Sequence, residues 1–134
     1  METIFTRIIK GEIPCYKIAE DERFFAFLDI NPLMGGHTLV VPKKHTSYIF
    51  DMEDKELGEM MIFAKKVAKA VEQAIPCKRI GVAVIGLEVP HTHIHLVPIS
   101  EENDINFRKA SRPQFSKEEM QEMADKIVAA YGSL

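Results

Sequence analysis

HTHIHLVP, at residues 91–98, places a histidine at every second position from 91 to 95: His91, His93 and His95. A repeat of two is typical of a β-strand, whose successive side chains point to opposite faces. Neighbouring histidines would lie about 6.6 Å apart, because a strand rises about 3.3 Å per residue. The stretch therefore predicts a strand with a titratable row on one face and an apolar face behind it.

Three aligned imidazoles would be costly to bury for packing alone, because each needs its own polar partner. On residue types, two functional interpretations stay open: a metal centre, since imidazole nitrogens ligate zinc, and a phosphate or acyl site. No cysteine or carboxylate follows the row within five residues, and the nearest one before it is Glu88. This pattern favours the phosphate or acyl site.

The composition indicates one globular domain that spans residues 1–134, with 46% hydrophobic and 28% charged residues. A net charge of −3 without a dense basic patch argues against non-specific nucleic-acid binding. No apolar run is long enough for a membrane span, and the opening METIFTRIIKGEIP lacks a secretory apolar stretch. Cys15 and Cys77 have no metal or redox spacing, so we expect free thiols in the cytoplasm.

Periodicity and turn residues predict short consecutive strands and two main helices, an α+β fold with a five-stranded antiparallel sheet. Thr3 and Gly11 bound a short first helix, Pro76 ends the long one, and Ser116 with Glu119 forms a capping box for the last. The predicted helices cover residues 4–10, 54–75 and 117–130, and the predicted strands cover residues 16–20, 23–29, 38–41, 80–85 and about 92–98.

The chemistry available to the histidine row is nucleophilic. A neutral imidazole, common at pH 7 because the usual pKa is near 6.5, can attack phosphorus and leave again. His93 is central and is the predicted nucleophile, with His91 and His95 beside it. No GxxxxGK[ST] or GxGxxG motif is present, so a nucleotide would not be held by a P-loop or a Rossmann turn.

The row resembles the signature of the histidine-triad (HIT) superfamily, His-x-His-x-His with apolar residues between and after. Residues 3–14 (TIFTRIIKGEIP), 25–32 (FAFLDINP) and 36–45 (GHTLVVPKKH) resemble the histidine triad nucleotide-binding (Hint) branch. The resemblance implies a HIT-like fold, a homodimer and a purine nucleotide or nucleotide conjugate as ligand. It implies no cofactor.

The same resemblance implies a nucleotidyl hydrolase or transferase acting at an α-phosphate. By analogy His93 would form a nucleotidyl-histidine intermediate, His91 and His95 would orient it and contact the phosphate and leaving group, and His37 would complete the histidine set. Asp29 matches the position that holds the ribose hydroxyls. The residues that match the apolar wall around the base are Ile4, Phe5, Ile8, Phe27 and Ile30.

The chain departs from the family pattern just before the row. Similar proteins usually have a glutamine and then a small hydroxyl residue where this chain has Leu87 and Glu88. Leu87 cannot donate an amide hydrogen bond, and an ionised Glu88 would repel a phosphate. Thr3 and Thr6 stand where some bacterial relatives carry a zinc-binding cysteine pair, which argues against a metal.

Two classes of function follow. The first is an enzyme, a purine nucleoside phosphoramidase type of hydrolase, with a dinucleoside polyphosphate hydrolase as its substrate variant. The second is a nucleotide-binding regulatory module in which Leu87 and Glu88 have removed useful catalysis.

Overall fold

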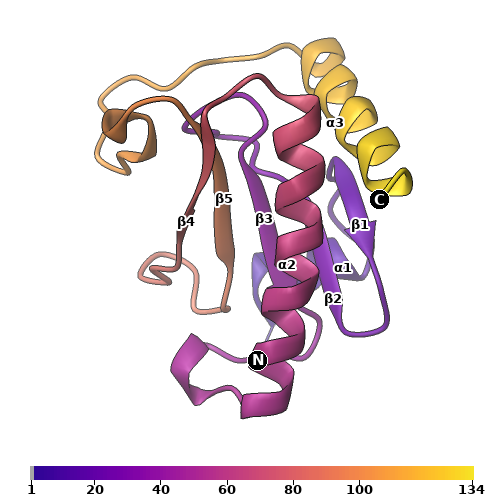
Figure 1. Cartoon of the computed structure of the whole chain (residues 1–134). Coiled ribbons are helices and arrows are strands. Elements are labelled where there is room, and N and C mark those ends of the chain that lie inside the picture. The colour runs from indigo at the N-terminus through magenta and orange to yellow at the C-terminus, as the bar shows by residue number, and fades with distance from the viewer. Residues whose placement is uncertain (1) are drawn as a thin grey trace.

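Five antiparallel strands form one sheet in the computed structural model, which describes residues 2–134 (Figure 1). The strands are β1 (Lys17–Glu20), β2 (Phe24–Leu28), β3 (Thr38–Pro42), β4 (Arg79–Ala83) and β5 (Ile94–Ile99), in the spatial order β1-β2-β3-β5-β4. The helices are α1 (Ile4–Ile9), α2 (Asp54–Ala74) and α3 (Lys117–Gly132), with 3₁₀ turns η1 (Ile49–Asp51) and η2 (Glu102–Ile105). The predicted α+β class, with its antiparallel five-stranded sheet and two main helices, is confirmed.

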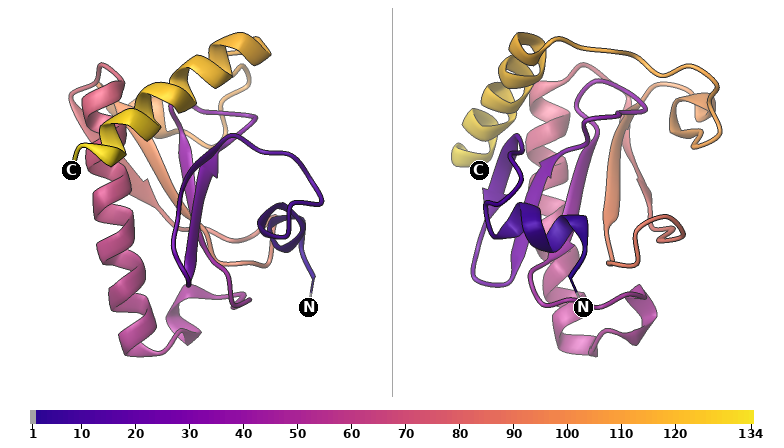
Figure 2. Two further views of the ribbon diagram at one scale, coloured as in Figure 1. Left: turned by 90° about the vertical axis from the view of Figure 1, so that its right-hand side faces the viewer. Right: turned by 180° about the vertical axis from the view of Figure 1, so that it is seen from behind.

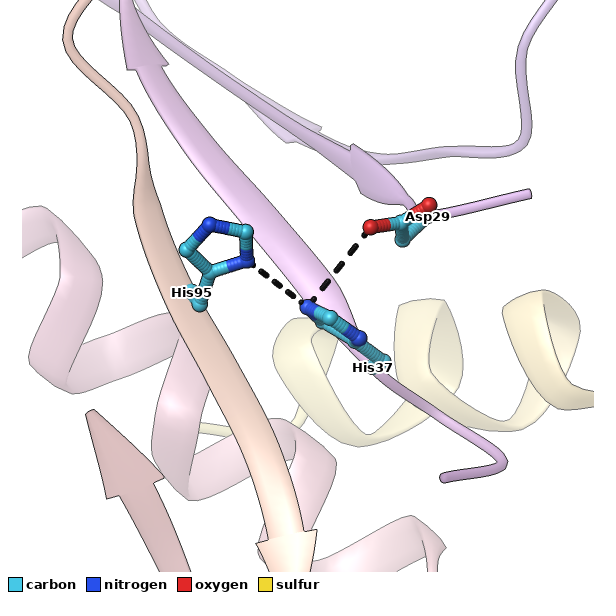
Figure 3. Close-up of side chains that lie close together, drawn as sticks. All are labelled: Asp29, His37 and His95. Carbon is cyan, nitrogen blue, oxygen red and sulfur yellow. Dashed lines mark hydrogen bonds and ion pairs between the residues drawn. The ribbon is translucent and has the colours of Figure 1, made fainter. Parts of the chain in front are cut away.

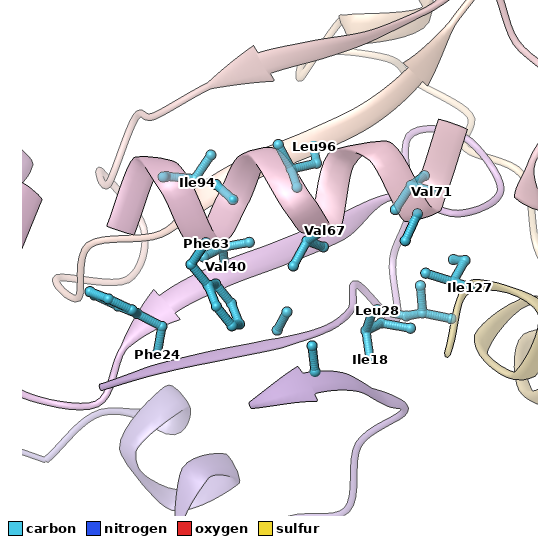
Figure 4. Close-up of a cluster of buried hydrophobic side chains, with 14 of the residues drawn as sticks. Ile18, Phe24, Leu28, Val40, Phe63, Val67, Val71, Ile94, Leu96 and Ile127 are labelled. Atoms are coloured by element: carbon cyan, nitrogen blue, oxygen red, sulfur yellow. The ribbon is translucent and has the colours of Figure 1, made fainter. Parts of the chain in front are cut away.

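One face of the sheet packs against α2 and α3 (Figures 1 and 4). Alternate strand residues such as Leu28, Val40 and Leu96 point to this side and are buried with Val67 of α2 and Ile127 of α3. Each fully buried aliphatic side chain contributes about 1.5–3 kcal/mol relative to exposure. This layer is therefore the main hydrophobic core of the fold.

The opposite face carries α1, which lies alone on that side of the sheet (Figure 2). Phe25, Phe27 and Leu39 point there and pack with Phe5 and Ile8 of α1. Because strand side chains alternate, the residues that build the main core leave their neighbours free for this second, smaller layer. The histidines lie on this face.

Local signals explain where the helices begin and end. The Thr3 hydroxyl accepts from the Thr6 amide at the start of α1, and Ser116 and Glu119 form the expected capping box of α3. Helix α2 ends one residue earlier than predicted, at Ala74. Ile75 is extended because it precedes Pro76, and a residue before proline is disfavoured in the α region.

The histidine row is not one continuous strand, so the prediction of a strand from about residue 92 is corrected. Strand β5 begins at Ile94, and His91 and His93 precede it. Thr92 bonds through both its amide (2.8 Å) and its hydroxyl (2.7 Å) to the Thr46 carbonyl, outside the sheet ladder. These bonds hold the chain in a turn-like path until Ile94 pairs with Val40 of β3.

Candidate active site

A cavity of about 640 Å³ opens on the α1 side of the sheet. Eight of the ten residues predicted for the site line it, whereas His91 and His37 do not. The eight are Ile4, Phe5, Ile8, Phe27, Asp29, Ile30, His93 and His95. His91 and His37 are fully buried behind the cavity wall. The expected contact of His91 with a phosphate therefore stays a prediction, and His91 has no place in the cavity lining.

His93 is held in a single tautomer by the backbone. Its Nδ1 lies 2.7 Å from the His91 carbonyl oxygen, which can only accept, so Nδ1 carries the proton. Burial lowers the pKa of His93, which keeps the ring neutral near pH 7. Nε2 is then an unprotonated nitrogen. Among residues 2–134 every fully buried side-chain nitrogen has a partner, and Nε2 has none, so it is accessible from the cavity.

His91 is fixed from both of its nitrogens. Nε2 donates to the Pro42 carbonyl at 2.9 Å, and Nδ1 accepts from the Thr3 hydroxyl at 2.8 Å. Burial lowers the pKa of His91, so the ring is neutral and has one donor and one acceptor, both satisfied. The edges of the Phe5 and His45 rings pack against it, at centroid distances of 5.7 Å and 5.1 Å. His45 is half-buried beside the site.

His37 and His95 form a hydrogen-bond relay with a defined direction (Figure 3). The Leu33 amide donates to His37 Nδ1 at 3.0 Å, so the proton of the neutral ring lies on Nε2. That nitrogen donates to His95 Nδ1 at 2.9 Å, which leaves the proton of His95 on Nε2. Burial lowers the pKa of His37 to about 3 and that of His95 to about 4, so both rings are neutral at pH 7. His95 thus offers an N–H donor next to His93.

The turn before His37 explains how that ring reaches the sheet. Gly36 has a φ of +91°, and a Cβ there would lie 2.8 Å from the Ile75 side chain. Glycine is the residue that adopts this conformation without strain. The tight turn brings His37 directly beside β5.

Asp29 follows β2 and is a half-buried carboxylate at the edge of the cavity. One oxygen accepts from the Asn31 amide at 2.8 Å, and the other lies 3.7 Å from His37 Nε2 (Figure 3). Burial raises the pKa of this carboxyl, and the hydrogen bond from Asn31 opposes the shift. Asp29 is therefore an acceptor with one oxygen available to a ligand.

Asp29, His37 and His95 are also the one group of residues 2–134 whose side chains come close enough together to hold a cation, with ligand atoms within 4.8 Å. Their present arrangement supplies hydrogen bonds rather than free lone pairs. The facing nitrogens of His37 and His95 share one proton, and the other His37 nitrogen is occupied by the Leu33 amide. A zinc ion would need both facing nitrogens unprotonated.

The segment after η2 supplies site residues that the sequence reasoning missed. Phe107 packs against His95 at a centroid distance of 4.7 Å, and Arg108 and Arg112 line the cavity. The sequence around them is the cationic run FRKASR at residues 107–112, which begins with an aromatic residue. The run has no periodicity and no motif, so the sequence did not indicate that it contacts the histidines.

The loop between β4 and the histidines forms the other wall of the cavity. Leu87 is 89% exposed there, and Glu88 is an exposed carboxylate whose charge opposes the lowering of the His93 pKa. Both departures from the family pattern therefore lie at the site itself.

These observations describe an α+β protein with an accessible, unprotonated imidazole nitrogen in an apolar cavity. Residues 10–102 match the HIT domain family, which is more than half of the chain. The chain belongs to the HIT domain family.

Known proteins similar to the chain agree with this assignment. It is 34% identical over 133 residues to a HIT-like protein of Borreliella burgdorferi, covering 94% of this chain and 96% of that protein. It is 35% identical over 130 residues to an adenosine 5′-monophosphoramidase of Schizosaccharomyces pombe, covering 95% and 96%. A solved histidine triad nucleotide-binding protein of Sulfolobus tokodaii superposes with a TM-score of 0.83 at 29% identity, covering 98% and 93%.

Proposed function

We propose that the protein is a nucleotidyl hydrolase of the nucleoside phosphoramidase type, which acts at the α-phosphate of a purine nucleotide conjugate. The observation that carries the proposal is the His93 ring, whose Nδ1–H donates to the His91 carbonyl and whose Nε2 is unprotonated and accessible. A nucleophilic nitrogen next to an N–H donor on His95 is the arrangement that covalent phosphoryl transfer needs.

In the first step His93 Nε2 attacks the α-phosphorus, and the bond from phosphorus to the leaving amine nitrogen breaks. The amine leaves with its electron pair and takes a proton from solvent. His95 Nε2 donates a hydrogen bond to a phosphoryl oxygen, on which negative charge develops. In the second step water attacks phosphorus, the bond to Nε2 breaks, and the proton of the water goes to solvent. The proton stays on His93 Nδ1, which donates it in a hydrogen bond to the His91 carbonyl oxygen throughout.

The cavity has the size and polarity for a nucleotide. Its volume of about 640 Å³ lies within the range of small-molecule sites. The apolar end, formed by Phe5, Ile8 and Phe27, suits a purine ring, and the free Asp29 oxygen suits the ribose hydroxyls. The phosphoramidase relative in Schizosaccharomyces pombe supports this substrate class.

Two alternatives are kept because of particular residues. The cationic Arg108 and Arg112 at the cavity favour a dinucleoside polyphosphate as substrate. The Glu88 carboxylate favours a nucleotide-binding module with little catalysis, because it repels an incoming phosphate.

The decisive experiment is single-turnover hydrolysis of an adenosine 5′-phosphoramidate with intact-mass detection of the protein. We expect turnover and a transient adenylyl adduct in the wild type, and neither in His93→Ala. His93→Gly with added imidazole is the matched control, because free imidazole can replace a missing nucleophile without restoring the adduct. Equal rates in wild type and His93→Ala would reject the mechanism. Nucleotide binding without turnover in either would favour the binding module.

We further propose a homodimer that functions in the cytoplasm. Strand β4 is an edge of the sheet, and the apolar side chains of Val82 and Ile85 are 56% and 47% exposed. An unpaired apolar edge of this kind is suited to pairing with a second copy. Light scattering of wild type and Val82→Lys tests the dimer, which the lysine should disrupt.

Among residues 2–134 no helix is long and apolar enough to cross a membrane.

A further inference from the structure

The segment that follows η2 runs along the end of the sheet towards α3 (Figure 2), and its side chains contact the candidate site. Phe107 anchors it, with its ring against His95 and His37 at centroid distances of 4.7 Å and 6.5 Å. This contact brings Arg108 and Arg112 into the cavity wall that also contains His93 and His95.

The segment is positively charged in a chain with a net charge of −3. Arg108, Lys109 and Arg112 lie within five residues, and no acidic residue occurs between Asp104 and Glu118. Such a charge next to the reacting nitrogen attracts anions to the cavity.

Two of the three cations also have a structural role. The Lys109 ammonium donates to the Leu33 carbonyl at 3.3 Å, and the Arg112 guanidinium donates to the carbonyls of Asn31 (2.9 Å) and Phe107 (3.2 Å). These bonds hold the segment against the loop between β2 and β3 but do not neutralise its charge, because carbonyl oxygens are uncharged. A guanidinium has five N–H donors, so Arg112 keeps others for a ligand.

Arg108 has no such structural role. Its side chain is exposed and lines the cavity, and within residues 2–134 it takes part in no hydrogen bond or ion pair. No carboxylate of the described chain lies within ion-pair distance of Arg112 either. The cavity wall therefore carries two positive charges that no carboxylate pairs with directly, although the Asp29 and Glu88 carboxylates line the same cavity.

We propose that Arg108 and Arg112 form a subsite for an anionic group on the leaving part of the substrate, in addition to its α-phosphate. The inference rests on the proposed function, in which His93 and His95 take the α-phosphate and the apolar end at α1 takes the base. The leaving part then extends toward the segment after η2. A phosphate or a carboxylate fits equally, because a guanidinium binds either through paired N–H donors.

The Arg108 and Arg112 subsite is tested by measuring ligand binding to the His93→Ala variant, in which we expect no turnover. Calorimetry compares AMP with ADP for the phosphate, and the adenosine 5′-phosphoramidate of glycine with that of glycinamide for the carboxylate. We expect the anionic member of at least one pair to bind about tenfold more tightly, as for a partly exposed charge-assisted hydrogen bond. Arg108→Gln should remove most of that advantage, and Arg108→Glu should reverse it. Lys117→Gln, an exposed cation outside the cavity, should leave it unchanged.

The outcomes separate this inference from the proposed function. Equal affinities within both pairs, or an advantage that Arg108→Gln leaves intact, would overturn the subsite. The pair that shows the advantage identifies the anion as phosphate or carboxylate. Wild-type turnover of the uncharged adenosine phosphoramidate tests the enzyme separately. A charge preference without any turnover would retain the subsite and reject the hydrolase.

Discussion

The Thr3 hydroxyl donates to His91 Nδ1 at 2.8 Å, across 88 positions of the sequence. The same hydroxyl caps α1 by accepting from the Thr6 amide, and the His91 carbonyl accepts the Nδ1 proton of His93. The Thr3 side chain thus connects the start of α1 to His91. The His91 backbone in turn fixes the tautomer of His93, the proposed nucleophile.

Thr3→Val should therefore reduce both stability and catalysis. The substitution keeps the shape but leaves His91 Nδ1 buried without a donor and removes the cap, for a loss of about 2 kcal/mol in the free energy of unfolding. We expect a lower single-turnover rate with little change in nucleotide affinity, because His91 is outside the cavity. Thr3→Ser retains the hydroxyl and should restore both values. If Thr6→Val, which weakens only the cap, reduced the rate as much, the role of the His91 bond would be rejected.

The stability of the fold should decline steeply below pH 6.5. Burial lowers the pKa of His37 to about 3 and of His95 to about 4, against an unfolded value near 6.5. The unfolded chain therefore binds protons first as the pH falls. Between pH 6.5 and about 4, each ring removes about 1.4 kcal/mol of stability per pH unit. Urea unfolding at pH 7, 6 and 5 measures the slope, which should be flatter in His37→Asn. Equal slopes in the two proteins would contradict the assignment to His37.

Gly36→Ala should destabilise the protein and displace His37. Its Cβ would meet the Ile75 side chain at 2.8 Å in a backbone conformation with φ +91°. We expect a loss of about 2 kcal/mol, from overpacking and strain together. Gly58→Ala is the matched control, since Gly58 lies in α2 with no atom within 4 Å of an added Cβ. That substitution should stabilise the helix by about 0.5–1 kcal/mol. Thermal unfolding of both variants measures the difference, and similar shifts would argue against a special role of Gly36.

Much of the fold was predictable because its signals are local. The short apolar runs of β2 and β3 and the capping residues Thr3 and Ser116 identified the sheet class and the helices. The start of β5 was not predictable from local signals. It depends on the Thr46 carbonyl, which lies in a distant loop and accepts hydrogen bonds from Thr92.

The candidate site was likewise predictable only in part. The family motifs led to His93 and His95 and to the apolar residues that line the cavity. The burial of His91 and the direction of the relay from Leu33 through His37 depend on tertiary hydrogen bonds, and no spacing in the sequence encodes them. Arg108 and Arg112 were missed because they reach the cavity through the packing of Phe107 on His95.

Glu88 should limit the binding of anionic substrates. Its carboxylate lines the cavity, repels an incoming phosphate, and favours the protonated form of His93 by opposing the lowering of its pKa. Glu88→Gln should therefore bind AMP a few-fold more tightly, an effect of about 1 kcal/mol for one charge near the surface. The acid limb of the rate profile should move to lower pH, because His93 then stays neutral further into the acid range. Calorimetry at two salt concentrations and rates from pH 4.5 to pH 8 measure both effects, with Glu22→Gln on the distant β1–β2 turn as control. An unchanged affinity and pH profile would show that the Glu88 charge does not reach the reaction centre.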